Sequence, residues 1–272
     1  MAQRLNIEEL KDTARSLRRE ILKVIAKAGS GHPGGSLSSV EIILTLYGTK
    51  LRFDPKQPES PDRDVFIISK GHGTLTAYAV LAEFGFFPKE ELQHFRELDC
   101  RLQGHAHRSV PGIEASTGSL GQGLSIANGF ALAAKLDGSD RRTYCLLGDG
   151  ESQEGQVWEA AMTAAHRNLN NVCAIVDANG VQQNGPVSTI KDLEPLADKW
   201  QSFGWNALDI DGHDVEALIK AYDAAEKETS KPTVIIARTK KGKGISFMEG
   251  NHKWHGKAPK PDELEAALAE LK

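Results

Sequence analysis

Two turns in the chain carry side chains suited to holding a hard cation. Gly148-Asp149-Gly150 follows an apolar run at 143–147, and Asn179 follows a second run at 171–176. Both runs are short and bounded by turn residues, so they predict buried parallel strands. A carboxylate and an amide at such strand ends suit Mg²⁺, which takes oxygen ligands and shares them with phosphates. The glycines let backbone N–H groups approach phosphate oxygens. The alternative is two ordinary strand-end turns.

Four histidines lie in glycine-rich segments: His32 in GHPGG, His72 in KGHG, His105 in QGHAH and His255 in WHGKAP. Because none lies on an apolar face, a role in the core is disfavoured. Loops after parallel strands gather at the ligand crevice of α/β folds, and neutral imidazoles both donate and accept hydrogen bonds. The pattern indicates recognition and proton transfer on a polyhydroxylated substrate. For each histidine alone, a solvated loop position is the alternative.

Apolar spacing predicts the elements that must position these side chains. Helices and strands alternate, which predicts an α/β fold with a mostly parallel sheet covered by helices on both faces. We expect a single domain over residues 1–272, with an N-terminal helical arm and a loop-rich C-terminal extension. Helices are expected at 7–28, 36–51, 89–98, 192–203, 214–228 and 262–271. Two more are expected: one that residues 70–73 open, and one that runs from the 118–123 loop to about residue 136. Further strands are expected at 64–69, 205–210 and 233–237.

The composition of the chain restricts its partners and its cellular compartment. The chain has 272 residues and a formal net charge of −4 at pH 7, which disfavours nucleic-acid or anionic-membrane partners. Three cysteines (Cys100, Cys145 and Cys173) give no disulfide framework and indicate a reducing compartment. There is no apolar N-terminal stretch and no window of transmembrane length. A cytoplasmic, soluble protein is expected.

The order of the motifs GHPGG, SKGHG, TGSLGQG, GDG with its later Asn, and WHGKAP resembles that of transketolases, from about Leu17 to Pro259. The resemblance implies the diphosphate-binding fold of thiamine diphosphate (ThDP) enzymes. It also implies a metal, Mg²⁺ or else Ca²⁺ or Mn²⁺, held by Asp149, Asn179 and the carbonyl of Val181. The residues it implies for contacts with ThDP are Gly118, Ser119, Leu120, Gly148, Gly150, Glu154, Asn179 and His255.

The same resemblance gives the histidines a catalytic role. Those matching His32, His72, His105 and His255 contact the hydroxyls of the donor ketose or the cofactor. Glu154 and Glu159 match two buried acids at the transketolase subunit interface. The alternative for both acids is an ordinary acidic start of a helix.

Transketolases are much longer than this chain, and the resemblance covers only their first domain. In that family the catalytic Glu, the aromatic residues that stack on the aminopyrimidine and the groups that bind the sugar phosphate lie in the next domain. Either the sequence is a fragment, or it is a natural subunit whose partner, a C-terminal transketolase subunit, carries the pyrimidine-binding domain. The initial Met and the amphipathic segment 262–272 favour a subunit, expected in an α2β2 heterotetramer.

The predicted function is reversible transfer of a two-carbon ketol unit from a ketose phosphate to an aldose phosphate through ThDP. One alternative is the α-type subunit of another split ThDP enzyme, such as a 2-oxo acid dehydrogenase. Others are a transketolase specialised for an unusual sugar phosphate and a non-catalytic paralogue. A zinc cluster of His94, Cys100, His105 and His107 and a nicotinamide-binding loop at 118–123 both fit the spacing poorly.

Overall fold

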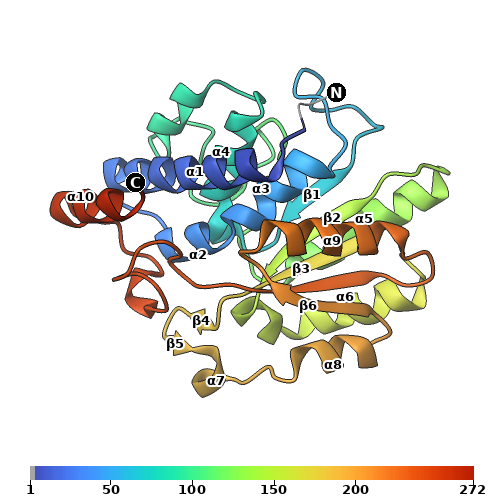
Figure 1. Ribbon diagram of the computed structural model, residues 1–272. Helices are drawn as coiled ribbons and strands as arrows, with labels where there is room; N and C mark the ends of the chain where they lie inside the picture. Colours follow the sequence, from blue (N-terminus) through green and yellow to red (C-terminus); the bar gives the residue numbers. More distant parts are fainter. Residues whose placement is uncertain (1–3) are drawn as a thin grey trace.

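A five-stranded parallel sheet forms the centre of the protein, whose computed structural model describes residues 4–272 (Figure 1). The strands lie in the order β1-β2-β3-β7-β6, and every neighbouring pair is parallel. The predicted mostly parallel α/β sheet is confirmed. The bounds are β1 Val65–Ile68, β2 Thr143–Gly148, β3 Val172–Ala178, β6 Asn206–Asp211 and β7 Thr233–Arg238.

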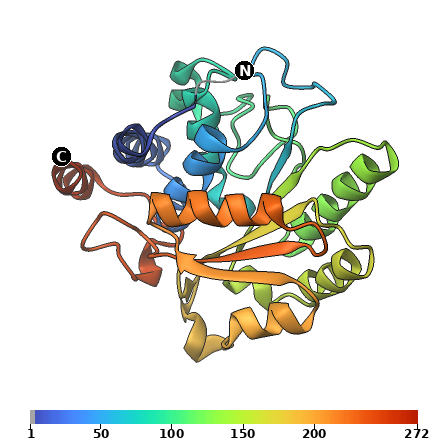
Figure 2. The same ribbon diagram turned by 45° about the vertical axis from the view of Figure 1, so that its right-hand side comes forward.

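Helices cover both faces of this sheet (Figures 1 and 2). Successive side chains of a strand point to opposite faces, so Phe66 and Ile68 of β1 join one apolar cluster, while Val65 and Ile67 join the other. The first cluster includes α1 (Ile7–Ala28), α3 (Val40–Thr49), α4 (Thr74–Glu83), α9 (Val215–Lys227) and α10 (Pro261–Glu270). The second includes α5 (Gln122–Leu136), α6 (Gly155–His166) and α8 (Leu196–Ser202). The continuous apolar strands are therefore explained by burial on both sides.

Helix α1 shows why several boundaries were predictable from local chemistry. The Asn6 side chain accepts from the Glu9 amide, the Glu9 carboxylate accepts from the Asn6 amide, and the helix ends at Gly29 with φ of 64°. A capping box and a left-handed glycine satisfy the end groups of a helix. The predicted helix at 7–28 is confirmed. No helix within residues 4–272 has the length and apolarity that crossing a bilayer requires.

Three predicted helices differ from the structure. The helix expected at 36–51 is instead α2 (Pro33–Ser38) followed by α3. The hydroxyls of Ser38 and Ser39 and the ammonium of Lys70 all donate to the Gly35 carbonyl, which competes with a continuous helical hydrogen bond there.

The other two differences have simpler causes. The segment expected as a helix at 89–98 is a 3-10 turn, η2 (Lys89–His94). It ends where Phe95 leaves helical backbone (ψ of 126°), and the left-handed Arg96 (φ of 65°) follows. The helix expected at 192–203 begins only after Pro195, because a proline disfavours helical backbone before it. Between β3 and α8 lie a small hairpin, β4 (Val181–Gln182) with β5 (Gly185–Pro186), and the short α7 (Val187–Ile190).

The order of the strands creates a crevice at one edge of the sheet. The chain passes from β3 to β6, skips the position between them and returns to fill it with β7. Helix α8, which follows β3, packs on one face of the sheet, whereas the chain after β7 leads to α10 on the other. Loops after the carboxyl ends of β3 and β7 therefore diverge, which is where ligands bind in open α/β sheets.

Two glycines of α5 test how closely this helix packs. A Cβ at Gly123 would lie 2.4 Å from Ser69 Cβ at the end of β1, whereas a Cβ at Gly129 would meet nothing within 4 Å. We expect Gly123→Ala to lower the free energy of unfolding by about 2 kcal/mol through overpacking. Gly129→Ala is the matched control and should raise it by about 1 kcal/mol through helix propensity. Urea unfolding of both variants checks this, and equal effects would contradict the packing.

Candidate functional site

The carboxyl edge of the sheet gathers the predicted metal ligands. Asp149 follows β2 and is buried, and its carboxylate accepts from the amides of Gly150 (2.7 Å) and Gly180 (2.6 Å). Burial and the neighbouring Asp177 carboxylate raise the pKa of Asp149 to about 6. Buried acids side by side favour a bound cation.

Asn179 and Val181 lie on the turn after β3, next to this carboxylate. The Asn179 side-chain oxygen accepts from the Val181 amide at 3.1 Å. The Val181 carbonyl accepts from the Lys241 ammonium at 3.0 Å. A carboxylate, an amide and a backbone carbonyl are the oxygen donors that Mg²⁺ and Ca²⁺ take. The donor chemistry therefore fits the metal predicted from the sequence.

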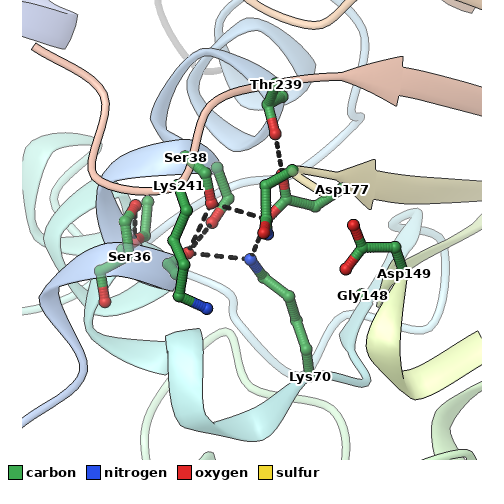
Figure 3. A network of polar contacts seen from close by, with 12 residues as sticks. Ser36, Ser38, Lys70, Gly148, Asp149, Asp177, Thr239 and Lys241 are labelled. Carbon is green, nitrogen blue, oxygen red and sulfur yellow. Dashed lines mark hydrogen bonds and ion pairs between the residues drawn. The ribbon is translucent and has the colours of Figure 1, made fainter. Parts of the chain in front are cut away.

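A buried polar network lies behind these ligands (Figure 3). Lys70, after β1, forms an ion pair with Asp177 of β3, and both side chains are buried. Ser38 donates to the same carboxylate at 2.7 Å, and Thr239, after β7, donates to its other oxygen. Burial alone would raise the pKa of Asp177, but Lys70 and these donors hold it below its ordinary value. One carboxylate thus joins four segments of the chain.

The four predicted histidines come together beside this network. The ring centroid of His32 lies 5.4 Å from that of His72, 6.1 Å from that of His105 and 5.5 Å from that of His255. The rings of His72 and His255 are 4.9 Å apart. Residues separated by more than two hundred positions therefore form one imidazole cluster.

These imidazoles are held neutral. Burial and the guanidinium of Arg96 lower the pKa of His32 to about 4, and burial and Lys241 lower that of His255 to about 3. Burial and Lys70 place the pKa of His72 well below its ordinary value, and burial and Arg96 lower that of His105. Near neutral pH the cluster donates and accepts hydrogen bonds without carrying charge.

Glu151 braces the loop that carries Asp149. Its buried carboxylate accepts from the amides of Gly121 (2.8 Å) and Gly148 (2.9 Å) and from the Ser69 hydroxyl. These bonds tie the ends of β1 and β2 to the start of α5. Burial raises the pKa of Glu151 in spite of them.

Sequence reasoning missed four buried charged groups of this site: Lys70, Glu151, Asp177 and Lys241. Lys70 lies in the quoted SKGHG segment, Glu151 directly follows GDG, and Asp177 lies two positions before Asn179. A charged residue inside an apolar strand is rarely buried without a partner, and that signal could have singled out Asp177. Lys241 lies in the basic stretch 240–243, yet it is buried and its ammonium also lies 2.9 Å from His255 Nδ1.

The remaining predicted residues lie just before α5, just before α6 and on α6. Gly118 lies against Gly71: a Cβ added to Gly71 would be 2.8 Å from the amide nitrogen of Gly118. Ser119 and Leu120 are exposed before α5, Glu154 is exposed just before α6, and Glu159 is exposed on that helix. The two acids are therefore not buried in the chain alone.

The zinc cluster considered from the sequence does not form. Within residues 4–272, no three or more His, Cys, Asp or Glu side chains are placed to hold a metal. His94 instead contacts Glu97, and His107 contacts Ser109. Cys145 and Cys173 are buried and Cys100 is half-buried, and all three are free thiols.

A second buried network supports the Lys241 loop from behind. Arg18 of α1 pairs with Glu41 of α3, whose carboxylate also lies 3.0 Å from His213 Nδ1. His213 Nε2 accepts from the Lys240 amide at 2.9 Å. Burial alone would raise the pKa of Glu41, but Arg18 and His213 lower it to about 2. A chain of contacts therefore runs from the helical layer to the loop after β7.

Comparison with known proteins identifies the family to which this arrangement belongs. Residues 9–271 match the family model described as transketolase, thiamine diphosphate binding domain. The chain belongs to the transketolase family. The family and the fold predicted from the motifs are thereby confirmed.

Relatives of two lengths occur in this family. The chain is 44% identical over 270 residues to a subunit of the apulose-4-phosphate transketolase of Actinobacillus succinogenes, covering 98% of each chain. It is 43% identical over 264 residues to a 6-deoxy-6-sulfo-D-fructose transketolase subunit of a Clostridium species, covering 97% of this chain and 96% of the relative. The crystal structure of Campylobacter jejuni transketolase matches with a TM-score of 0.90 at 35% identity. That match covers 98% of this chain but only 43% of the longer transketolase.

The lowered histidine pKa values predict how stability depends on pH. An unfolded imidazole binds a proton near pH 6.5, but folded His32 does so only near 4, so the unfolded state takes up more protons in between. The free energy of unfolding should fall as pH drops from 6.5 to 5, by up to about 1.4 kcal/mol per pH unit for each such histidine, and less where water reaches the ring. Urea unfolding at several pH values should show that the free energy of unfolding depends less on pH in His32→Gln than in the parent chain. An unchanged dependence on pH would contradict the low pKa of His32.

The Lys70–Asp177 pair predicts a large stability effect. Lys70→Met should lower the free energy of unfolding by about 3–5 kcal/mol, because it leaves a buried carboxylate without its partner. Lys70→Met combined with Asp177→Asn should recover part of that loss. Lys11→Met, which removes an exposed helical pair with Glu8, is the control and should change little. A small effect of Lys70→Met in urea unfolding would show that the pair is not structurally important.

Proposed function

We propose that this chain is the diphosphate-binding half of a two-chain transketolase. It transfers a two-carbon ketol unit reversibly from a ketose phosphate to an aldose phosphate, with ThDP and Mg²⁺, when its partner is present. One observation carries the proposal: a neutral histidine cluster lies beside an edge of oxygen donors that suits a metal–diphosphate. We also propose that residues 1–272 act as one domain in the cytoplasm.

The site residues fit the cofactor by charge and shape. Asp149, Asn179 and the Val181 carbonyl would hold the metal, and Lys241 adds a buried cation suited to diphosphate oxygens. The close approach of Gly71 to Gly118 leaves no room for a side chain there. ThDP supplies the electron sink that makes carbon–carbon cleavage possible. The proposed protein contacts are Gly118, Ser119, Leu120, Gly148, Gly150, Glu154, Asn179 and His255.

The histidines would handle the hydroxyls and the protons of the sugar. Nδ1 of His255 faces the Lys241 ammonium, which only donates, so His255 carries its proton on Nε2. Since His32, His72, His105 and His255 are neutral, they can bind the hydroxyls of a ketose without repelling a cationic thiazolium. They can also pass a proton where an alkoxide develops.

A partner chain accounts for the exposed apolar side chains of α5 and α6. Leu132 is 39% exposed, Leu136 is 80% exposed and Met162 is 52% exposed. Glu154 and Glu159 are exposed at the start of α6 and along it. We propose that a C-terminal subunit carrying the pyrimidine-binding domain completes the site and that the assembly is an α2β2 heterotetramer, which would bury these residues.

The identity of the donor sugar phosphate is a separate part of this proposal. If the donor is xylulose 5-phosphate, the reaction is that of the pentose phosphate pathway. The subunit-length relatives are named for apulose 4-phosphate and 6-deoxy-6-sulfo-D-fructose. Their similarity in length and sequence favours a specialised substrate of this kind for the present chain as well.

A ketol-transfer assay tests the proposal. The purified chain is incubated with Mg²⁺, ThDP, each candidate donor and an aldose phosphate, with and without the partner subunit. We expect product only from the mixture. Activity of this chain alone would contradict the two-chain assignment. No activity from an assembled mixture with any of the three donors would favour a non-catalytic role.

Asp149→Ala tests the metal assignment directly. The variant should bind ThDP with Mg²⁺ at least a hundredfold more weakly in the presence of the partner, because it loses a charged ligand. Its circular dichroism should match the parent chain. Asp198→Ala, at an exposed position on α8 that does not line the pocket beside Asp149, is the control. Retained affinity of Asp149→Ala in calorimetry would refute the assignment.

A further inference from the structure

Arg96 has a backbone conformation that is unusual for its residue type. Its φ is 65°, in the left-handed region where residues other than glycine are uncommon. The Arg96 amide donates to the Leu102 carbonyl at 2.9 Å, which closes the loop and holds this conformation. Strained residues persist where the surrounding structure demands them, and they cluster at functional sites.

The strained backbone directs the guanidinium of Arg96 into the histidine cluster. Its Nη2 lies 3.4 Å from His32 Nδ1, and its Nη1 donates to Ser30 Oγ at 3.3 Å. It also fills the space beside Gly104, where a Cβ would lie 2.5 to 2.6 Å from three guanidinium atoms. Gly104 immediately precedes His105, so the cation lies between two of the clustered histidines.

A guanidinium has donors only and is always charged. The His32 nitrogen that faces it must therefore be the acceptor, which leaves the proton of the neutral ring on Nε2. That nitrogen points toward the loop of His255, since a Cβ at Gly256 would lie 3.9 Å from it. His32 thus presents an N–H donor to the interior of the cluster.

The same geometry occurs on the other side of the cluster. Lys241 places its ammonium 2.9 Å from His255 Nδ1. Two cations from different loops therefore bind the outer nitrogens of two facing histidines whose ring centroids are 5.5 Å apart. The packing of Arg96 against the Phe95 ring, at 5.5 Å, does not by itself require this orientation.

We propose that Arg96 is a positioning residue that fixes His32 as the Nε2–H tautomer and keeps it a hydrogen-bond donor toward a carbonyl or hydroxyl oxygen of the sugar. The role rests on the proposed ketol transfer for its consequence, but the contact itself can be measured in the chain alone. Charged and titratable groups around His32 are Arg96, His105, Lys241, His72 and His255.

Arg96→Gly is a suitable variant, because glycine adopts the left-handed backbone without strain while the whole side chain, with its guanidinium, is lost. Asp99→Gly is the matched control, since Asp99 has φ of 64° in the same loop and is exposed. Both variants should keep or gain thermal stability. Arg96→Gly should lower kcat by at least tenfold, and added methylguanidine should restore part of this activity. Arg96→Lys should restore less of it than methylguanidine does. Asp99→Gly should retain the parent kcat.

The deciding readout is the ring nitrogens of His32 in ¹⁵N-histidine NMR of the chain alone, assigned by comparison with His32→Gln. We expect Nδ1 of the parent chain to remain unprotonated from pH 8 to 5. In Arg96→Gly we expect tautomer exchange or protonation within that range. A parent chain with the proton on Nδ1, or an Arg96→Gly spectrum equal to that of the parent, overturns the proposal even if activity falls. A changed spectrum without any ketol transfer in the parent assembly would instead count against the proposed function.

Discussion

The structure depends on one buried ion pair, between Lys70 and Asp177. Both side chains are buried, and the pair joins the end of β1 to β3, while Ser38 and Thr239 bring in the GHPGG segment and the loop after β7. A buried charge without a partner is costly, so these segments are held together by the need to satisfy one carboxylate. His32, His72 and Lys241 lie on the segments that this pair joins, whereas Glu151 fixes the loop of Asp149.

Burial, together with the charges around the site, determines the protonation state of the histidines. Burial is the larger cause of their lowered pKa values, and the cations Lys70, Lys241 and Arg96 act in the same direction, so the imidazoles stay neutral. The arrangement separates two tasks: fixed cations suit phosphate oxygens, and neutral rings suit hydroxyls. A cluster of free histidines in water would titrate near neutral pH and serve neither purpose as well.

The sequence indicated part of this site, because Asp149, Asn179 and His72 follow strands and the other histidines lie in glycine-rich segments. Asp149, Asn179 and the four histidines had recognisable local sequence, and parallel strands bring such turns to one edge. Lys70 and Asp177 are 107 positions apart, and nothing local indicates that they pair. The break at Ser39 and the left-handed Arg96 were also missed, because competing side-chain bonds and loop closure outweigh the apolar spacing.

The most direct test of the account is the position of the metal in the assembled enzyme. Crystals of the chain with its partner, grown with ThDP and Mn²⁺, would locate the ion by anomalous scattering. We expect a single peak per chain, within coordination distance of oxygens of Asp149, Asn179 and Val181. A peak elsewhere, or ThDP bound with its diphosphate away from this edge, would contradict the central claim.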